Sequence, residues 1–396
     1  MENEYRPFFS RKQLTVLMWF SLLAILVLSS LGPGDVEYQK IQHNDAKSIY
    51  WMELDDQLNT LTLLLPSQPS LTQSQQRLQQ LKAQVLLQRL KTHKNTAFTY
   101  NVYPRQDRIE LSLTWASDGD LPNISELLFR LKQPVEANRW QEVLKTLEAR
   151  DYLDNKAKEE QVIQQFFSHL QSDTANTLTA LTTSYANLFD GVKYVISGDS
   201  AEDIAKNISE TIVVSNSGNE GKTLTTTPTN VSLQADTTSK YVFLTGTVIP
   251  PRTDSSFVSH RLTAQVLQDL LSAHKEQYKI DYRILWAALK NTGYQAVIIK
   301  ADQSPEAILP QLQQLITDEL VESSQNQLAY LWQERMRDLQ NQTHAMNLIA
   351  FYDLPHTTME DYVEQIQDQD IEDIIILARQ ALKTDQHINI LLTPSY

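Results

Sequence analysis

The sequence has no cysteine among its 396 residues, and this absence excludes several kinds of chemistry at once. Disulfide bonds, thiol nucleophiles and cysteine-ligated zinc sites all require a side chain that the chain does not contain. A chain without thiols also suits an oxidising compartment, in which stray thiols would be a liability. Cysteine-dependent enzymes and disulfide-stabilised scaffolds are therefore excluded.

Positive charge is scarce as well. The chain has 34 lysine and arginine residues against 48 aspartate and glutamate residues, which gives a net charge of −14 and a pI near 5.0. Such a surface repels phosphate backbones, so we expect no nucleic-acid partner. The hydrophobic content of 41% and the charged content of 21% are ordinary for a globular protein, and the length suffices for two domains.

Familiar catalytic motifs are missing or incomplete. There is no Gly-x-Ser-x-Gly elbow, and no two of the eight histidines lie within five positions of each other. The stretch "NSGNEGKT" (216–223) matches a phosphate-binding loop at Gly221, Lys222 and Thr223, but Asn216 occupies the place of the first glycine. No helix follows it to present amide groups to a phosphate, so a flexible linker is the better interpretation.

Two acidic stretches near the end of the chain resemble metal sites. His356, Glu360 and Asp361 carry ligand-type side chains, and "QDQDIEDII" (367–375) has carboxylates at calcium-like spacing. The first stretch is also typical of a helix that begins at Thr357 or Thr358, with Thr358 and Asp361 as a capping-box-like pair and acidic residues in the first turn. The second lacks the glycine and the final glutamate of a calcium loop and fits a capped helix start. We therefore expect no metal at either stretch.

The N-terminal region predicts a membrane anchor. Residues 13–34 carry no charge and are mostly apolar over a length that spans a bilayer. Three basic residues precede this segment and two acidic residues follow it, so residues 1–12 are expected in the cytoplasm and the rest of the chain outside it. Residues 35–50 read as a polar stalk. A cleaved signal peptide is the competing interpretation.

The remaining sequence alternates strands and helices in two similar halves. Strand patterns at 58–66, 96–104 and 108–116 surround a helical pattern at about 72–91, and the order strand, helix, strands, helices restarts at 241. Between the halves, residues 215–240 are rich in Ser, Thr, Asn and Gly, as in a linker or long surface loop. We therefore expect an internally duplicated α+β protein with domains at 51–214 and 241–396.

The order of these elements resembles the insulinase-type zinc peptidases, the pitrilysin and mitochondrial-processing-peptidase family. The resemblance rests on "TAFTYNVYPRQDRIELSLTW", "GVKYVISGDSAEDIAKNI" and the succession from "AVIIKADQSPEAILPQLQQL" to "HINILLTP". It implies two homologous domains of antiparallel sheet packed with helices, which fold over a cavity.

Active members of that family carry His-x-x-Glu-His on the first long helix of the N-terminal domain, which supplies two zinc ligands and a general base. The corresponding helix here, about 72–91, contains neither His nor Glu. The resemblance therefore implies a chain with no catalytic residues, no metal and no cofactor. The family's second domain often grips substrate with an Arg and a Tyr; Gly293 and Tyr294 are kept, but the Arg position is Ala287, and Arg283 and Lys290 are out of register. Tyr294 is the one candidate substrate-binding residue.

We expect a non-catalytic protein, anchored in a bacterial inner membrane with its domains in the periplasm, that pairs with an active zinc peptidase homologue or with itself. The same expectation includes a protein that binds peptides in the cavity between its domains. A structural or assembly protein of the envelope, without peptide binding, is the alternative. A hydrolase with a divergent site is a third hypothesis, for which His93 is the nearest histidine.

Overall fold

The computed structural model describes residues 18–19, 36–44, 46, 48–92, 98–154, 157–173, 177–211, 223–235 and 240–394. The chain divides into two compact units, 1–37 and 38–396, and the fold described below belongs to the second. Apart from Met18 and Trp19, the expected anchor at 13–34 lies outside the described residues. Within the described ranges, no helix combines the length and the apolar composition that a membrane span requires.

The first half contains a mixed sheet, sheet 1, whose described strands follow the order β1-β2-β6-β3-β5-β4. These strands are β1 (Gln42–Asn44), β2 (Ile49–Glu53), β3 (Leu58–Pro66), β4 (Thr99–Pro104), β5 (Arg108–Ala116) and β6 (Lys193–Gly198). β2 runs parallel to β6, and the other neighbouring pairs are antiparallel. Strands β3, β4 and β5 lie where the sequence pattern predicts them.

The second half contains sheet 2, with the order β7-β11-β8-β10-β9 among the described strands. These are β7 (Thr229–Ala235), β8 (Tyr241–Ile249), β9 (Ile280–Ala288), β10 (Gly293–Ala301) and β11 (Ile388–Pro394). β7 is parallel to β11, and the remaining pairs are antiparallel. Strand for strand, β7-β11-β8-β10-β9 repeats β2-β6-β3-β5-β4, so the halves share one topology, as an internal duplication predicts.

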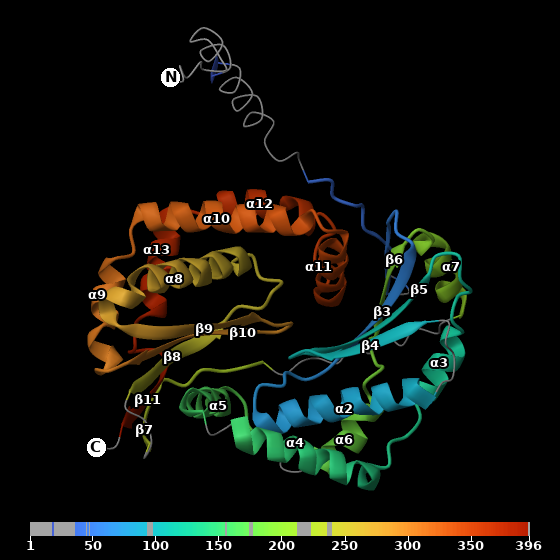
Figure 1. The fold of residues 1–396 in the computed structure, drawn as a ribbon, viewed down its shortest axis with the longest axis horizontal. Helices are drawn as coiled ribbons and strands as arrows, with labels where there is room; N and C mark the ends of the chain where they lie inside the picture. The colour runs from blue at the N-terminus through green and yellow to red at the C-terminus, as the bar shows by residue number, and fades with distance from the viewer. Residues whose placement is uncertain are drawn as a thin grey trace, which may run out of the picture. The chain divides into compact units, whose positions relative to one another are not determined.

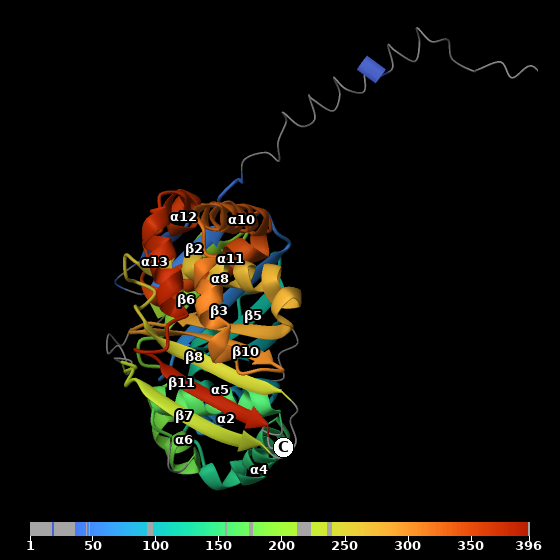
Figure 2. The same ribbon diagram turned by 90° about the vertical axis from the view of Figure 1, so that its left-hand side faces the viewer.

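Three sequence-based expectations differ from this architecture. The sheets are mixed rather than antiparallel, because β2 pairs in parallel with β6 and β7 pairs in parallel with β11. The expected stalk at 35–50 contains β1 and the beginning of β2, and the expected linker at 215–240 contains β7. Figure 2 shows β7 beside β11 at the edge of sheet 2. The sequence missed β2 and β7 for one reason: their parallel partners β6 and β11 follow far later in the chain, so no local pattern indicates the pairing.

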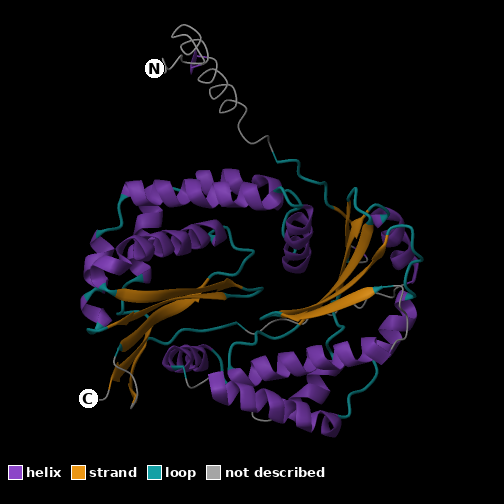
Figure 3. Ribbon diagram, in the orientation of Figure 1, coloured by secondary structure: helices purple, strands orange, loops and turns teal. Residues whose placement is uncertain are grey.

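Helices cover both sheets (Figures 1 and 3). Those described in the first half are α2 (Gln73–Thr92), α3 (Ile124–Leu131), η2 (Ala137–Trp140), α4 (Gln141–Asp154), α5 (Lys158–Leu170), α6 (Thr177–Ala186) and α7 (Ala201–Thr211). Those described in the second half are α8 (Phe257–Tyr278), η3 (Pro305–Ala307), α9 (Leu309–Gln314), α10 (Asp318–Met336), α11 (Leu339–Tyr352), α12 (Thr358–Gln367) and α13 (Ile371–Ala381). Side chains cap several of these helices; the Asp370 carboxylate, for example, accepts from the amides of Glu372 and Asp373.

Each sheet buries one face against helices of its own half. In β3, Leu61, Leu63 and Leu65 point to the same side because strand side chains alternate, and they pack with Leu81 and Val85 of α2. The equivalent face of sheet 2 packs against α8 and α13, and α10 packs on these two helices. Burial of these leucines and valines supplies about 1.5–3 kcal/mol each relative to exposure.

The opposite faces are covered by helices exchanged between the halves. Helix α5 of the first half lies on sheet 2, where Phe166 and Phe167 join the core formed by Leu244, Ile298 and Ile390. Helix α11 of the second half lies against β2, β3 and β6 of sheet 1. Figure 1 shows α5 and α8 on opposite sides of sheet 2. Side chains from both halves therefore meet between the two sheets.

Candidate functional site between the two halves

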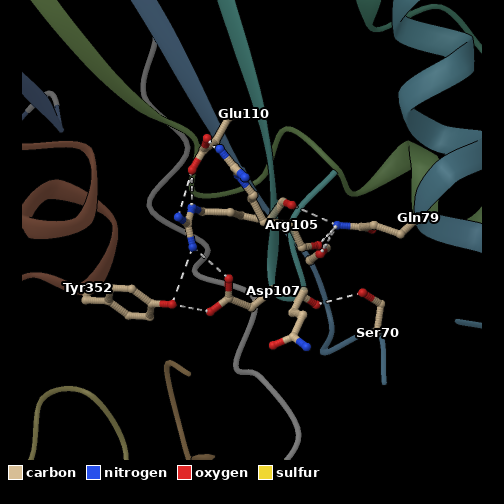
Figure 4. Close-up of polar contacts among 9 residues, drawn as sticks. Ser70, Gln79, Arg105, Asp107, Glu110 and Tyr352 are labelled. Carbon is tan, nitrogen blue, oxygen red and sulfur yellow. Dashed lines mark hydrogen bonds and ion pairs between the residues drawn. The ribbon is translucent and has the colours of Figure 1, made fainter. Parts of the chain in front are cut away.

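The start of β5 carries a buried ion network (Figure 4). One terminal guanidinium nitrogen of Arg108 lies 2.7 Å from a carboxylate oxygen of Glu110, and the other lies 3.0 Å from Oδ1 of Asp107. The side chains of Arg108, Asp107 and Glu110 are 7%, 4% and 5% exposed. Burial alone lowers the pKa of Arg108, but the nearby Asp107, Tyr352 and Glu110 outweigh it and raise the pKa above its usual value. The Arg108 guanidinium therefore stays charged within the network.

Tyr352, the last residue of α11, connects this network to the second half. Its hydroxyl donates to Oδ2 of Asp107 at 2.7 Å and accepts from Arg108 at 3.4 Å. Burial, followed by the neighbouring Asp107 carboxylate, raises the pKa of Tyr352. Nearby, the Lys193 ammonium of β6 donates to the Ala350 carbonyl at 2.7 Å and pairs with Asp353. The exchanged helix α11 is therefore held to sheet 1 by directional polar contacts.

Helix α2 approaches the network from the other side. Nε2 of Gln79 donates to the carbonyl oxygens of Arg108 at 2.9 Å and Arg105 at 3.2 Å and to Oγ of Ser67 at 2.7 Å. One turn on, Lys82 is only 5% exposed, and burial lowers its pKa to about 8. An amide engaged as a donor and an ammonium group do not bind zinc, and α2 carries no His, Asp or Glu. The zinc ion that active insulinase-type peptidases use does not fit the residues on α2.

Tyr294, the candidate substrate-binding residue, lies in β10 and is 4% exposed. Its ring packs 5.1 Å from Phe167 of α5, and its hydroxyl accepts from Nε2 of Gln106 at 2.5 Å. Burial raises the pKa of Tyr294. Ala287, which occupies the position of the expected arginine, lies on β9 directly opposite Tyr294. Tyr294 therefore makes contacts between the halves, and its role in substrate binding stays a prediction.

Two other residues of the expected substrate-gripping pattern, Arg283 and Gly293, have structural roles in sheet 2. Arg283 of β9 points to α5, where its guanidinium lies 3.2 Å from a carboxylate oxygen of Glu159. Gly293 begins β10 opposite Ala288, and a Cβ at Gly293 would come within 2.3 Å of the Ala287 carbonyl oxygen. This close strand approach requires a glycine.

The stretch around His356 forms a helix start. Helix α12 begins at Thr358, and its N-cap is Thr357, whose side chain makes no capping hydrogen bond; the expected capping pair of Thr358 and Asp361 is therefore wrong. Glu360 and Asp361 do lie in the first turn, as predicted from the helix dipole. The ring of His356 instead contacts His43 of β1, with centroids 3.8 Å apart. In the described part of the chain, no three His, Asp or Glu side chains are grouped closely enough to hold a metal ion. His93 lies outside the described residues.

Sequence reasoning missed the network of Asp107, Arg108, Glu110 and Tyr352. One signal was present in "RIELSLTWA": its alternate positions, from Arg108 and Glu110 to Ser112 and Thr114, are all polar and therefore share one face of β5. A strand buried on one face and charged on the other indicates a polar interior surface. The partner Tyr352, on a helix of the other half, carries no such signal.

Comparison with known proteins shows that this fold is similar to that of solved M16 peptidase structures. No family model and no curated protein sequence matches the chain. Solved structures do match: the peptidase M16 inactive domain from Pseudomonas fluorescens superposes with a TM-score of 0.69 at 13% identity, over 91% of this chain and 98% of that one. A putative M16-like peptidase from Alicyclobacillus acidocaldarius gives a TM-score of 0.66 at 11% identity, over 90% and 98%.

A longer protein matches over part of its length. The periplasmic protease PqqL from Escherichia coli gives a TM-score of 0.64 at 14% identity, and the match covers 91% of this chain and 47% of that one. Taken together, these structures have in common an α+β fold with two mixed sheets packed with helices. The resemblance to insulinase-type peptidases, inferred from the order of elements, is thus confirmed at the level of the fold.

Proposed function

We propose that this chain is a non-catalytic M16-like protein that binds polypeptide segments between its two halves or pairs with an active M16 peptidase. The observation that carries the proposal is the combination of the two-half fold with an α2 that offers Gln79 beside the buried network and a buried Lys82 one turn on. Neither side chain can hold zinc or act as a carboxylate base at neutral pH.

The fold also offers groups for binding. Polar side chains meet between the halves, as in the contacts of Tyr352 with Asp107 and of Gln106 with Tyr294, and the edge strands β4 and β9 leave backbone groups for another chain to pair with. One of the matching proteins is described as an inactive M16 domain, and another as a periplasmic protease. By analogy, we propose that the present chain is retained for recognition and that its partner supplies the catalytic site.

We further propose that residues 13–34 anchor the protein in a bacterial inner membrane, with the folded unit in the periplasm. The uncharged segment and the basic residues before it support this orientation. Fractionation of cells and protease protection of intact spheroplasts test it. We expect the protease to digest the folded unit only after the outer membrane has been permeabilised. Full protection of the folded unit in spheroplasts would argue against the orientation.

The functional proposal is tested by affinity purification of the full-length chain from detergent-solubilised membranes. Recovery of a peptidase that carries His-x-x-Glu-His is expected for the pairing function. Sedimentation of the purified chain distinguishes a homodimer from a heterodimer. Stoichiometric zinc together with peptide cleavage by the purified chain alone would refute the non-catalytic assignment.

A further inference from the structure

A cavity of about 820 Å³ lies in the second half, between the start of α8 and the helices α10, α11 and α12. Figure 1 shows these four helices near one another. The volume falls within the range of about 300–1,000 Å³ that is usual for ligand sites. Aromatic rings line it: Trp332 and Tyr362 have centroids 4.5 Å apart, and Phe257 and Trp286 have centroids 5.8 Å apart. The walls can therefore hold a flat or apolar group.

Three arginines line the same cavity: Arg252, Arg261 and Arg335. Elsewhere in the described part, arginines such as Arg77 and Arg283 are held by carboxylates. Within the described ranges, the guanidinium groups of the three cavity arginines form no ion pair or hydrogen bond, and Nε of Arg252 is enclosed without an acceptor. An enclosed donor without an acceptor is costly, and such a cost is met when a ligand supplies the acceptor.

Aromatic rings hold two of these guanidinium groups in place. The guanidinium carbon of Arg252 lies 4.8 Å from the ring centroid of Phe257 and 5.3 Å from that of Tyr352, and that of Arg261 lies 5.7 Å from that of Trp286. Stacking of a guanidinium on a ring leaves its in-plane N–H donors available. The cation–π contacts thus position donors without consuming them.

The other titratable groups of the cavity leave this positive character in place. Its carboxylates are Asp254 and Asp368. Asp254 already accepts from the amide and the hydroxyl of Ser256, at 2.8 and 2.6 Å. Burial lowers the pKa of His344, so its ring is neutral at neutral pH. In a chain of net charge −14, the cavity therefore holds three arginines against two carboxylates, and in the described part of the chain no carboxylate is ion-paired with these arginines.

We propose that this cavity binds a carboxylate-bearing segment of a polypeptide, with the three arginines on the carboxylate and the aromatic walls around an adjacent apolar side chain. Guanidinium groups pair with carboxylates through two parallel hydrogen bonds. The aromatic walls favour a ligand with an apolar body over a bare inorganic anion. The proposal rests on the peptide-binding function proposed above, and it specifies the chemical group of the peptide that the protein recognises. The carboxylate belongs either to a C-terminus or to an acidic side chain.

Calorimetric titration of the full-length protein with defined peptides tests the proposal. The probes are N-acetyl-Ala-Leu-Phe as the free acid, the same peptide as its C-terminal amide, the amide of N-acetyl-Glu-Leu-Phe, and inorganic phosphate. The free acid or the glutamate peptide is expected to bind at least about tenfold more tightly than the neutral amide. The tighter of the two identifies the source of the carboxylate, and phosphate is expected to compete only weakly.

Matched variants locate the binding. Arg261→Gln and Arg335→Gln should each weaken binding of the acidic peptide about tenfold, because each removes a charged donor. Arg139→Gln makes the same charge change at an exposed pair with Glu136 on η2 and should leave binding unchanged. Circular dichroism of each variant verifies folding.

Two outcomes would overturn the proposal. Equal affinity for acid, glutamate peptide and amide, or Arg261→Gln and Arg335→Gln variants that bind as the parent does, would remove the carboxylate site while leaving general peptide binding in place. No heat with any of the three peptides would remove peptide binding in the cavity altogether, but pairing with an active peptidase would still stand on its own purification experiment.

Discussion

The hydroxyl of Tyr352 lies 2.7 Å from Oδ2 of Asp107, and this hydrogen bond joins residues 245 positions apart, at the end of α11 and beside the start of β5. This hydrogen bond helps to hold α11 of the second half against sheet 1 of the first half. The ring of Tyr352 also lies 5.3 Å from the guanidinium carbon of Arg252, one of the three arginines that line the cavity.

Tyr352→Phe removes this hydrogen bond and keeps the ring. The variant is expected to lower the free energy of unfolding by about 1–3 kcal/mol, because a buried carboxylate loses a donor. Urea denaturation followed by tryptophan fluorescence measures the change. Tyr330→Phe, at an exposed position of α10, is the control and should change stability by less than about 0.5 kcal/mol. Equal effects of the two variants would contradict the importance of the contact.

Arg108→Met leaves the buried Asp107 without its cation and leaves Glu110 with Arg105 alone, at 3.0 Å. We expect a loss of about 3–5 kcal/mol of stability, as is typical when one partner of a buried ion pair is removed. Arg139→Met breaks an ion pair whose side chains are 75% and 68% exposed and should cost less than about 1 kcal/mol.

Neutralising the carboxylates tests the electrostatic origin of that loss. Combining Asp107→Asn and Glu110→Gln with Arg108→Met should restore part of the stability, because the amides no longer require a counter-charge. A triple variant as unstable as the sum of the single changes would instead indicate that packing dominates.

Lys82 predicts a pH dependence of stability. Its pKa falls from 10.5 to about 8 in the folded protein, so between these values the unfolded chain binds more protons. Stability should therefore rise with pH from about 8 towards 10, by up to about 3 kcal/mol in total, and be independent of this group below pH 8. Lys82→Met should remove the rise, as measured by the difference between the urea midpoints of the two proteins at each pH. The exposed Lys145→Met is the control, and an unchanged profile in Lys82→Met would refute the assignment.

Tyr294→Phe tests whether this buried hydroxyl is structural. Loss of its hydrogen bond with Gln106 should cost about 1 kcal/mol. In a double-mutant cycle, Gln106→Leu combined with Tyr294→Phe should cost less than the sum of the two single changes. Additive losses would show that the two side chains do not stabilise each other. A change of peptide affinity in Tyr294→Phe at unchanged stability would support the substrate-binding role expected from the sequence.

Gly246 permits the close approach of α5 to sheet 2. A Cβ at this position would lie 2.5 Å from the Cβ of Ala296 and 2.8 Å from a ring carbon of Phe166. Gly246→Ala should therefore cost about 1–3 kcal/mol through overpacking, and hydrogen exchange should increase first in α5. Gly119→Ala, whose nearest contact would be 3.1 Å, should be tolerated better. Faster exchange spread evenly over the whole unit would contradict a local effect.

The sequence predicted the elements whose signals are local. The alternating leucines of 58–66 and the periodic apolar residues of 72–91 correspond to β3 and α2, and the acidic start of α13 carries the expected cap at Asp370. It failed for β2 and β7, since a parallel partner from the far end of the same half decides whether these short polar-flanked segments become strands.

The candidate site was harder to predict than the fold. The absence of zinc ligands on α2 is visible in one segment, whereas the Asp107–Tyr352 contact depends on which helix crosses between the halves. The three cavity arginines lie in the loop after β8, in α8 and in α10, and nothing in their spacing indicates that they line a common space. Convergence of this kind is a property of tertiary packing alone.

The exchange of α5 and α11 has a consequence for how the protein could be divided. A polypeptide cut at residue 222 would yield two fragments, each lacking the helix that shields one side of its own sheet and carrying the helix that the other fragment needs. Separately produced, such fragments should be insoluble; produced together, they should reassemble without a covalent link, as a split-protein pair.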